Sequence, residues 1–144
     1  MAPIEIKKVL IYATHQGKLL VFDEPDFPHV ALQVPGGTVD PGEDILTAAR
    51  REFCEETGLP CPGQMNHLTT VLYEFHKPKG LQHHRRSFFH APLDPPLADT
   101  WEHYENFSHG GEPPIRFRFF WMSFAEARDR LGFGMNQLLD RIPQ

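Results

Sequence analysis

Apolar and β-branched residues recur in short runs along the chain, and most runs end at glycine, proline or another turn residue. Runs of this kind predict β-strands. The first two predicted strands are Ile6 to Ala13 and Lys18 to Phe22, joined by a turn at residues 15 to 17. The others are Ala31 to Val34, which stops before Pro35-Gly36-Gly37, then Leu68 to Phe75, Arg85 to Ala91 and Ile115 to Met122.

Residues 44 to 58 follow a helical period instead. Their apolar stripe consists of Leu46, Ala49 and Phe53. A stripe with this spacing is typical of a helix packed on a sheet. Asp44 is the expected N-cap, although Asp40 with Glu43 also fits a capping box. The helix is expected to end at about Thr57, because Gly58 follows in the position that glycine favours just past a helix.

The C-terminal third predicts two short helical segments, Phe124 to Leu131 and Met135 to Arg141. Prolines in APLDPPLADT and GGEPP bracket residues 92 to 114, so we expect a long surface loop there. Strands before and after one long helix predict a mixed α/β fold. With no repeat and no interdomain linker, residues 1 to 144 are interpreted as one domain.

Composition narrows the class of protein. The 144 residues are 40% hydrophobic and 12% aromatic, and the net charge is −5 with a pI near 6.0. This balance argues against a protein that coats nucleic acid or an anionic membrane. No run approaches the roughly 18 apolar residues of a membrane span, and the N-terminus lacks the features of a signal peptide. We therefore expect a cytoplasmic protein without a membrane partner.

Three other kinds of site are not favoured by the sequence. Cys54 and Cys61 have no CxxC spacing, and we interpret both as reduced and structural. The histidines of LQHHRR do not have the spacing of a zinc site. No segment has the alternating oxygen ligands of an EF-hand loop.

The strongest chemical signal is a cluster of glutamates on the predicted helix. Glu52, Glu55 and Glu56 fall within about 100° of one another on a helical wheel. Like charges this close repel each other, and Mg²⁺ and Mn²⁺ prefer oxygen ligands. A site for one or more divalent cations would explain the cluster, whereas a solvated acidic face is the plain alternative.

The segment that contains these glutamates, GTVDPGEDILTAARREFCEETGL, resembles the Nudix box of the Nudix hydrolases, G-x5-E-x7-R-E-U-x-E-E-x-G-U, where U is a bulky apolar residue. All nine specified positions match. They are Gly37, Glu43, Arg51, Glu52, Phe53, Glu55, Glu56, Gly58 and Leu59. The resemblance covers these 23 residues and implies a Nudix-like α/β/α sandwich with a mixed sheet and one catalytic helix.

The resemblance also implies roles. Glu52, Glu55 and Glu56 would bind Mg²⁺ or Mn²⁺, and the carbonyl of Gly37 would add a ligand. Arg51 would steady a carboxylate through an ion pair, and Glu43 would orient the turn into the helix. The implied reaction is metal-dependent hydrolysis of a pyrophosphate linkage in a nucleoside diphosphate joined to another group.

Residues outside the box are further candidates. Glu102, Glu105 or Glu112 could supply a general base, as a loop glutamate does in some members of the family, and TWEHYE favours Glu102, which lies between aromatic residues. The basic cluster Lys77, Lys79, Arg85 and Arg86 would suit phosphate contacts. Tyr73 lies about where some dinucleoside polyphosphate hydrolases carry a base-stacking tyrosine, and a core strand residue is the alternative interpretation.

The box indicates the reaction and leaves the substrate open. Nucleoside triphosphates, dinucleoside polyphosphates, nucleotide sugars, ADP-ribose and a capped RNA end all contain the linkage. The expected partner is thus a small nucleotide, with nucleic acid otherwise not expected and the oligomeric state left open. A second hypothesis is a nucleotide-binding regulator with the same fold and little turnover. The presence of all three box glutamates favours the enzyme.

Overall fold

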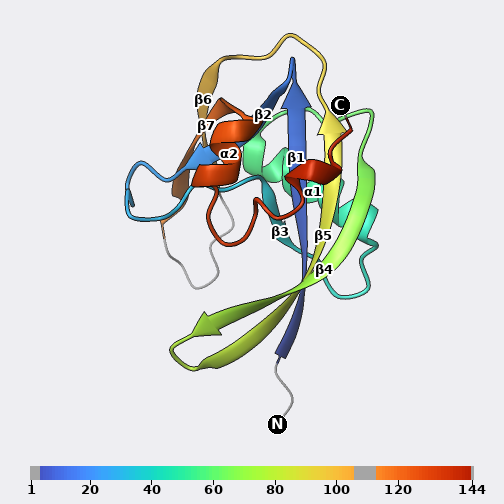
Figure 1. The fold of residues 1–144 in the computed structure, drawn as a ribbon, viewed down its shortest axis with the longest axis vertical. Helices are drawn as coiled ribbons and strands as arrows, with labels where there is room; N and C mark the ends of the chain where they lie inside the picture. Colours follow the sequence, from blue (N-terminus) through green and yellow to red (C-terminus); the bar gives the residue numbers. More distant parts are fainter. Residues whose placement is uncertain (1–3, 106–112, 144) are drawn as a thin grey trace.

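The computed structural model describes residues 4–105 and 113–143 of the chain, and within these residues seven strands form one sheet (Figure 1). The strands are β1 (Ile4–His15), β2 (Lys18–Asp23), β3 (Gly36–Thr38), β4 (Asn66–Lys77), β5 (Gly80–Pro92), β6 (Thr100–Glu105) and β7 (Ile115–Ser123). The helical elements are α1 (Ile45–Thr57), α2 (Phe124–Arg130) and the 3₁₀ helix η1 (Leu139–Arg141). The predicted strands at both ends of the chain and the central helix are thereby confirmed.

The strands lie in the order β4-β5-β1-β2-β7-β6, and β3 pairs with β1 outside this path. β1 and β5 run parallel, whereas the other pairs are antiparallel, so the sheet is mixed. β1 pairs with β2 only near the turn between them and with β3 further toward its start. The sheet therefore divides beside β1, and α1 follows from the β3 branch.

Helix α1 begins and ends as its sequence predicts. The Asp44 carboxylate accepts a hydrogen bond from the backbone N–H of Thr47, and Gly58 ends the helix with a left-handed φ of 74°. The alternative capping signal is used in part, because Glu43 accepts a hydrogen bond from the N–H of Asp40 at 3.0 Å. This contact shapes the turn before the helix.

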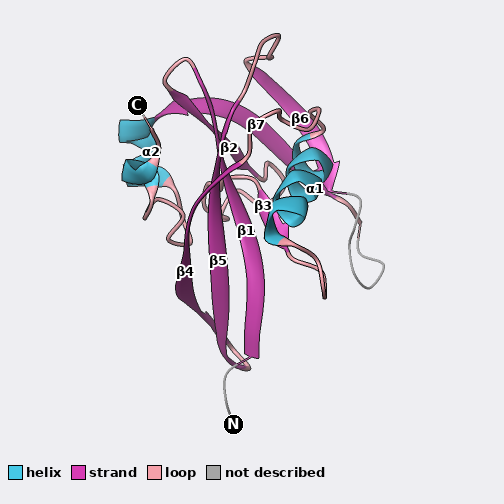
Figure 2. Ribbon diagram, turned by 90° about the vertical axis from the view of Figure 1, so that its right-hand side faces the viewer, coloured by secondary structure: helices cyan, strands magenta, loops and turns pink. Residues whose placement is uncertain are grey.

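Two hydrophobic cores lie on opposite faces of the sheet. The side view shows α1 on one side of the sheet and α2 on the other (Figure 2). Odd-numbered residues of β1, including Val9 and Ile11, pack with Phe53 of α1. Even-numbered residues of β1, including Tyr12, pack beneath α2 and the C-terminal segment. Strand side chains alternate between faces, so the parity of a residue on β1 decides which helix it meets. This arrangement is the α/β/α sandwich that the box implies.

Two sequence predictions about the strands were wrong. The strand predicted at residues 31 to 34 is absent, because these residues form only isolated bridges. Strand β3 begins instead at Gly36, just past Pro35, where the prediction ends the strand. A Cβ on Gly36 would lie 2.3 Å from the carbonyl oxygen of Val9, so this close pairing with β1 requires glycine.

The second wrong prediction is the long loop at residues 92 to 114. The segment contains strand β6, which pairs with β7 from Thr100 opposite Phe120 to Glu105 opposite Ile115. Its prolines bracket the strand and do not interrupt it. The TWEHYE segment therefore has a fixed register, with alternate side chains on the two faces of the sheet.

No helix in residues 4–105 or 113–143 is long and apolar enough to cross a membrane.

Candidate functional site

The candidate site lies where α1 passes the glycines of β3. The Glu56 carboxylate accepts a hydrogen bond from the N–H of Gly36 at 3.1 Å. The Glu52 carboxylate lies against the next residue, Gly37, because a Cβ there would be 2.1 Å from Glu52 Oε2. The two glycines thus bring the strand backbone directly against the carboxylates of the helix, and any larger residue at position 37 would displace one of them.

Arg51 gathers the remaining acids of the motif. Its Nη1 contacts Glu52 at 2.9 Å and Glu55 at 3.2 Å, while its Nε and Nη2 contact both oxygens of Glu43. Nη2 also donates to the carbonyl of Thr38, just past the glycines. One guanidinium therefore connects the turn before the helix, the helix itself and strand β3.

The acids differ in their electrostatic surroundings. The Arg51 guanidinium lowers the pKa of Glu43 to about 2. Burial raises the pKa of Glu52, against the effect of Arg51. Burial also raises the pKa of Glu56 well above its usual range, and the charges of Glu105 and Glu52 add to this shift. Glu52 and Glu56 are thus destabilised as anions in the absence of a further positive charge.

The chemistry of this donor set fits a hard divalent cation, because the candidate ligands, the three glutamates of α1 and the carbonyl of Gly37, all offer oxygen atoms. Within residues 4–105 and 113–143, however, no three acidic, histidine or cysteine side chains are gathered as a ready ligand set. Glu52 and Glu55 are instead held by Arg51, and Glu56 is held by Gly36. Binding of an ion by these three acids would require rotation of their side chains.

Strand β6 contacts the C-terminal end of α1 through two side chains that the sequence did not single out. Trp101 Nε1 donates to the carbonyl of Thr57 at 2.8 Å, and His103 Nε2 lies 2.9 Å from the carbonyl oxygen of Glu55. Carbonyls of a last helical turn lack partners within the helix. These two contacts supply partners and fix the end of the helix that carries the acids.

Glu105 lies on the same face of β6 as Trp101 and His103, two residues further along the strand. Its charge contributes to the raised pKa values of Glu52 and Glu56, after burial. Glu105 is therefore a fourth acid, which faces the carboxylates of helix α1 from strand β6.

The expectation that Glu102 points toward the acidic cluster was wrong. Glu102 is opposite Arg118 in the β6–β7 ladder and contacts Arg116 at 3.3 Å. Both arginines are on the face away from α1, because the alternating residues Phe117 and Phe119 pack in the α1 core. Because alternate residues of β6 point to opposite faces of the sheet, the Glu102 side chain cannot point toward α1 when Trp101 and His103 do. Glu112, the other acid considered, lies outside the described residues.

Lys8 is a site residue that sequence reasoning missed. Its Nζ donates to Thr38 Oγ1 at 2.7 Å, and burial lowers its pKa while the charge of Glu52 opposes that effect. A lysine on the inward alternation of an otherwise apolar strand was the available signal. Lys8 is opposite Arg86 in the parallel β1–β5 register, on the α2 face of the sheet.

The basic cluster predicted for phosphate contacts is divided between the two faces. Arg85 pairs with Glu5 at 2.7 Å on the α1 face. Arg86 is 3% exposed on the α2 face, and its guanidinium carbon lies 3.7 Å from the centroid of the Tyr73 ring. Lys77 extends over Phe75, with its nitrogen 5.8 Å from that ring centroid. Of Arg85, Arg86 and Lys77, only Lys77 is both exposed and on the same face of the sheet as Lys8.

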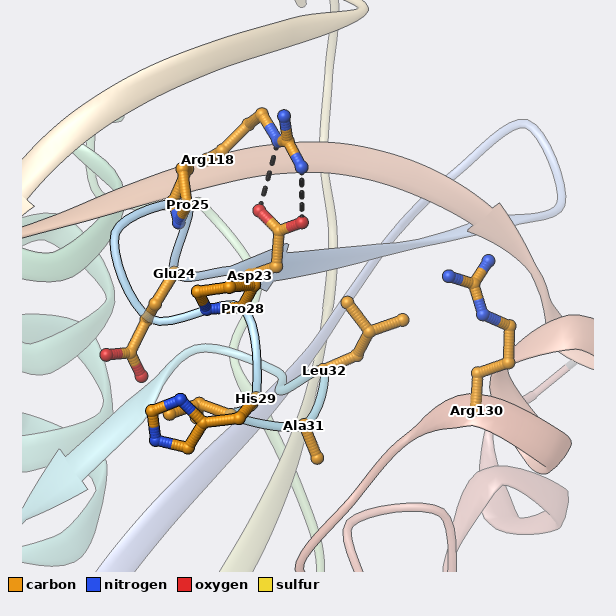
Figure 3. Close-up of a pocket in the computed structure, with 10 residues that line it drawn as sticks. Asp23, Glu24, Pro25, Pro28, His29, Ala31, Leu32, Arg118 and Arg130 are labelled. Atoms are coloured by element: carbon orange, nitrogen blue, oxygen red, sulfur yellow. Dashed lines mark hydrogen bonds and ion pairs between the residues drawn. The ribbon is translucent and has the colours of Figure 1, made fainter.

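A cavity of about 480 Å³ lies between residues 23–32, β7 and α2, and none of the nine motif residues lines it (Figure 3). On one side of the cavity Asp23 and Arg118 form an ion pair with two hydrogen bonds, and Arg130 of α2 lies on the opposite side. The charge of Glu24, which lines the cavity, adds to the raised pKa of Glu56, after burial. A second cavity, of about 560 Å³, lies beside Thr38 and Glu43.

The fold is an α/β/α sandwich, and its site consists of carboxylates on the helix that follows the glycines of β3. The family model of the NUDIX domain matches residues 7–142, and the chain therefore belongs to this family. No curated protein sequence matches the chain.

Three solved structures illustrate the likeness of the fold. The MutT NUDIX hydrolase of Burkholderia pseudomallei superimposes with a TM-score of 0.70 at 18% identity, over 96% of this chain and 98% of that one. The NUDIX domain of Shewanella oneidensis NrtR, in complex with ADP ribose, superimposes with a TM-score of 0.64 at 17% identity, over 98% of this chain and 86% of that one. The C. elegans Ap4A hydrolase superimposes with a TM-score of 0.58 at 19% identity, over 97% of this chain and 96% of that one.

Proposed function

We propose that the protein is a Mg²⁺- or Mn²⁺-dependent pyrophosphohydrolase that acts on a nucleoside diphosphate joined to another group. The observation that carries this proposal is the placement of Glu52 and Glu56 against Gly37 and Gly36, with Arg51 connecting Glu52 to Glu55. Glu52, Glu55 and Glu56, together with the carbonyl of Gly37, would hold the cation. When bound, it would neutralise the pyrophosphate and lower the pKa of a water molecule.

The reaction forms a bond between the water oxygen and one phosphorus and breaks the bridging P–O bond, which yields a nucleotide and a phosphorylated fragment. Glu105 is our candidate to accept the proton of the water, because it faces Glu52 and Glu56 from β6. Lys8 would contact a phosphate oxygen of the substrate, and Arg51 would release Glu52 and Glu55 to the cation while it keeps Glu43.

MutT, an Ap4A hydrolase and an ADP-ribose complex among the similar structures agree with a nucleotide substrate of this kind. These likenesses support a small-molecule partner, and a cytoplasmic location remains a prediction from the sequence. The named alternative is a nucleotide-binding regulator, which would bind one of these compounds without hydrolysing it.

The test is turnover of a panel of nucleoside triphosphates, dinucleoside polyphosphates, nucleotide sugars, ADP-ribose and capped RNA, with Mg²⁺, Mn²⁺ or EDTA. We expect at least one compound to be cleaved only with metal. Glu56→Gln should reduce that turnover by orders of magnitude and weaken Mn²⁺ binding measured by EPR, with no loss of apo stability. Asp129→Asn, an exposed acid on α2, is the control. Binding without cleavage of any compound would favour the regulator.

A further inference from the structure

The two cysteines of the chain lie beside each other at the end of α1. Cys54 is in the last turn of the helix and is half-buried, whereas Cys61 follows the helix and is exposed. The two thiols interact directly, and burial together with this neighbour raises the pKa of Cys54 to about 11. Their spacing along the chain is not that of a CxxC pair, so the contact is made by the fold and is not visible in the sequence.

The end of the helix brings the second cysteine back to the first. Gly58, in the left-handed region, ends α1 and redirects the chain, and its N–H donates to the carbonyl of Cys54 at 3.0 Å. Beyond it, Leu59 packs against the α1 core, and Met65 is buried in the same core. Cys61 lies between these two anchors and is therefore held next to the last turn of the helix.

Prolines on both sides make the backbone at Cys61 stiff. Pro60 has a fixed φ, and Pro62 disfavours helical backbone at the residue before it, which is Cys61. Pro62 is also buried. A stiff segment loses little conformational entropy when one of its side chains is bonded to a neighbour. The two thiols are therefore preorganised for a bond to each other.

Cys54 is on the face of α1 that is turned away from the acids of the candidate site. On an ideal helix, which has about 3.6 residues per turn, Cys54 lies roughly 160° around the axis from both Glu52 and Glu56. Those two carboxylates lie against the glycines of β3. A bond between Cys54 and Cys61 would therefore be made at the back of the helix and would not displace either carboxylate.

We propose that Cys54 and Cys61 are a reversible redox site, in which an intramolecular disulfide clamps the end of the acid-bearing helix. The oxidant would be a low-molecular-weight disulfide such as glutathione disulfide. The bond would close a ring that includes Glu55, Glu56 and the helix cap, and it would restrict fraying of the last turn. This inference does not depend on the proposed function.

The oxidation takes two thiol–disulfide exchange steps. In the first, the exposed Cys61 sulfur loses its proton and attacks glutathione disulfide, whose S–S bond breaks as a bond between Cys61 and glutathione forms, and one glutathione leaves and takes up a proton. In the second, the Cys54 sulfur loses its proton and attacks the Cys61 sulfur, and the other glutathione leaves in the same way. The two cysteines lose two electrons and two protons in total, which reduce one glutathione disulfide to two thiols.

The first test follows the bond itself in the full chain. Protein reduced with DTT and desalted is incubated with mixtures of glutathione disulfide and glutathione, unfolded, treated with iodoacetamide to block free thiols, and weighed by mass spectrometry. We expect the parent to be lighter by two hydrogens, with no blocked thiol and no attached glutathione. Cleavage after Glu55 or Glu56 by a glutamate-specific protease should give two peptides that separate only on reduction.

Two matched variants test the roles of the two thiols. Cys54→Ser should stop at the glutathione adduct of Cys61, because the attacking sulfur of the second step is absent. Cys61→Ser should react more slowly than Cys54→Ser, since its remaining thiol is half-buried. A parent that stops at the glutathione adduct under conditions that modify Cys54→Ser, or that forms a disulfide-linked dimer, would overturn the redox site.

The second test measures the clamp on oxidised and reduced parent protein, so that no substitution can disturb folding. The oxidised form should melt several degrees higher, and amides in the last turn of α1 should exchange more slowly. Mn²⁺ binding measured by EPR should be the same in both forms, because the bond is made away from the acids. An oxidised parent that melts no higher than the reduced one, or that binds Mn²⁺ less tightly, would overturn the clamp.

Discussion

The indole N–H of Trp101, in edge strand β6, donates to the carbonyl of Thr57, the last residue of the acid-bearing helix α1, at 2.8 Å. The two residues are 44 positions apart, yet this contact and the neighbouring one from His103 determine where the end of the helix lies. The position of Glu55 and Glu56 therefore depends on a strand that carries none of the Nudix box.

Trp101→Phe keeps a ring beside Phe119 and removes only the N–H donor. We expect a loss of about 1 kcal/mol of unfolding free energy, faster amide exchange in the last turn of α1 and several-fold weaker Mn²⁺ binding. Trp121→Phe is a matched control, because its indole donates at 3.0 Å to the carbonyl of Ala98, away from the helix. If both variants weakened Mn²⁺ binding equally, the effect of Trp101 on α1 would be general and not local.

The two glycines of β3 should respond differently to alanine. In Gly37→Ala the new Cβ meets the end of the flexible Glu52 side chain, so we expect a stability loss of about 1 kcal/mol or less and a large loss of metal affinity. In Gly36→Ala the Cβ meets the backbone oxygen of Val9, so about 2 to 3 kcal/mol should be lost. Urea denaturation with EDTA and Mn²⁺ titration separate the two effects, and similar destabilisation of both variants would contradict this account.

Glu105 and Glu102 provide a test of which face of β6 takes part in the reaction. Glu105→Gln should lower kcat by about two to four orders of magnitude if its carboxylate is the base. Glu102→Gln should leave kcat near that of the parent and change stability by about 1 kcal/mol or less, since its contact with Arg116 is exposed. Steady-state kinetics over a range of pH would decide, and the opposite order of effects would return the role to Glu102.

The α1 helix depends on Phe53 for its packing. The Phe53 side chain is fully buried in the core between α1 and the sheet. Phe53→Ala should cost about 3 to 5 kcal/mol, and activity should fall mainly through unfolding. Leu46→Ala, on the same helix at 38% exposure, should cost much less. Thermal melts in EDTA compare the two, and a Phe53→Ala protein that melts with the parent would show that α1 is held by other contacts.

His84 should respond to pH in a defined direction. Burial, together with the positive charges of Lys8, Arg86 and Lys77, lowers its pKa to about 4, whereas in an unfolded chain it would be about 6.5. Between these values the unfolded state binds a proton that the folded state does not. The contribution of His84 to stability is therefore constant above about pH 6.5 and falls as the pH decreases toward 4.

NMR titration of the His84 imidazole should show a neutral ring at pH 6, with Nε2 beside Gln82 at 3.2 Å. Urea denaturation at pH 7.5 and pH 5 should show a smaller loss of stability in His84→Gln than in the parent. An imidazole that titrates near pH 6.5 would mean that the ring is in contact with water and not enclosed by its three cationic neighbours.

The parts of the site that could be predicted from the sequence are those coded within a short segment. The helix from Ile45 to Thr57, its cap at Asp44 and the contact of Arg51 with Glu55 are all set by local spacing. A helix has a fixed period, so residues three and four apart have predictable relative positions. The contact of Arg51 with Glu43, which lies before the helix, was not predicted.

The parts that were wrong or missed depend on pairing between distant segments. The facing direction of Glu102 and Glu105 is decided by the register of β6 against β7, and a shift of one residue would exchange them. Tyr73 and Arg86 were correctly predicted to lie on strands, but the turn at residues 133 and 134 that contacts them is about 50 residues further along the chain. Sequence spacing carries no information about such contacts.

The order of the strands affects how the nascent chain folds during translation. β2 pairs with β7, whose residues are translated about a hundred positions later, and β1 pairs with β5, whose residues are translated about 80 positions later. At typical rates of synthesis the edges of β1 and β2 thus remain without their later partners for several seconds or more. During that interval their apolar strands are open to other chains, so chaperone dependence should be greatest for nascent chains that end before residue 115.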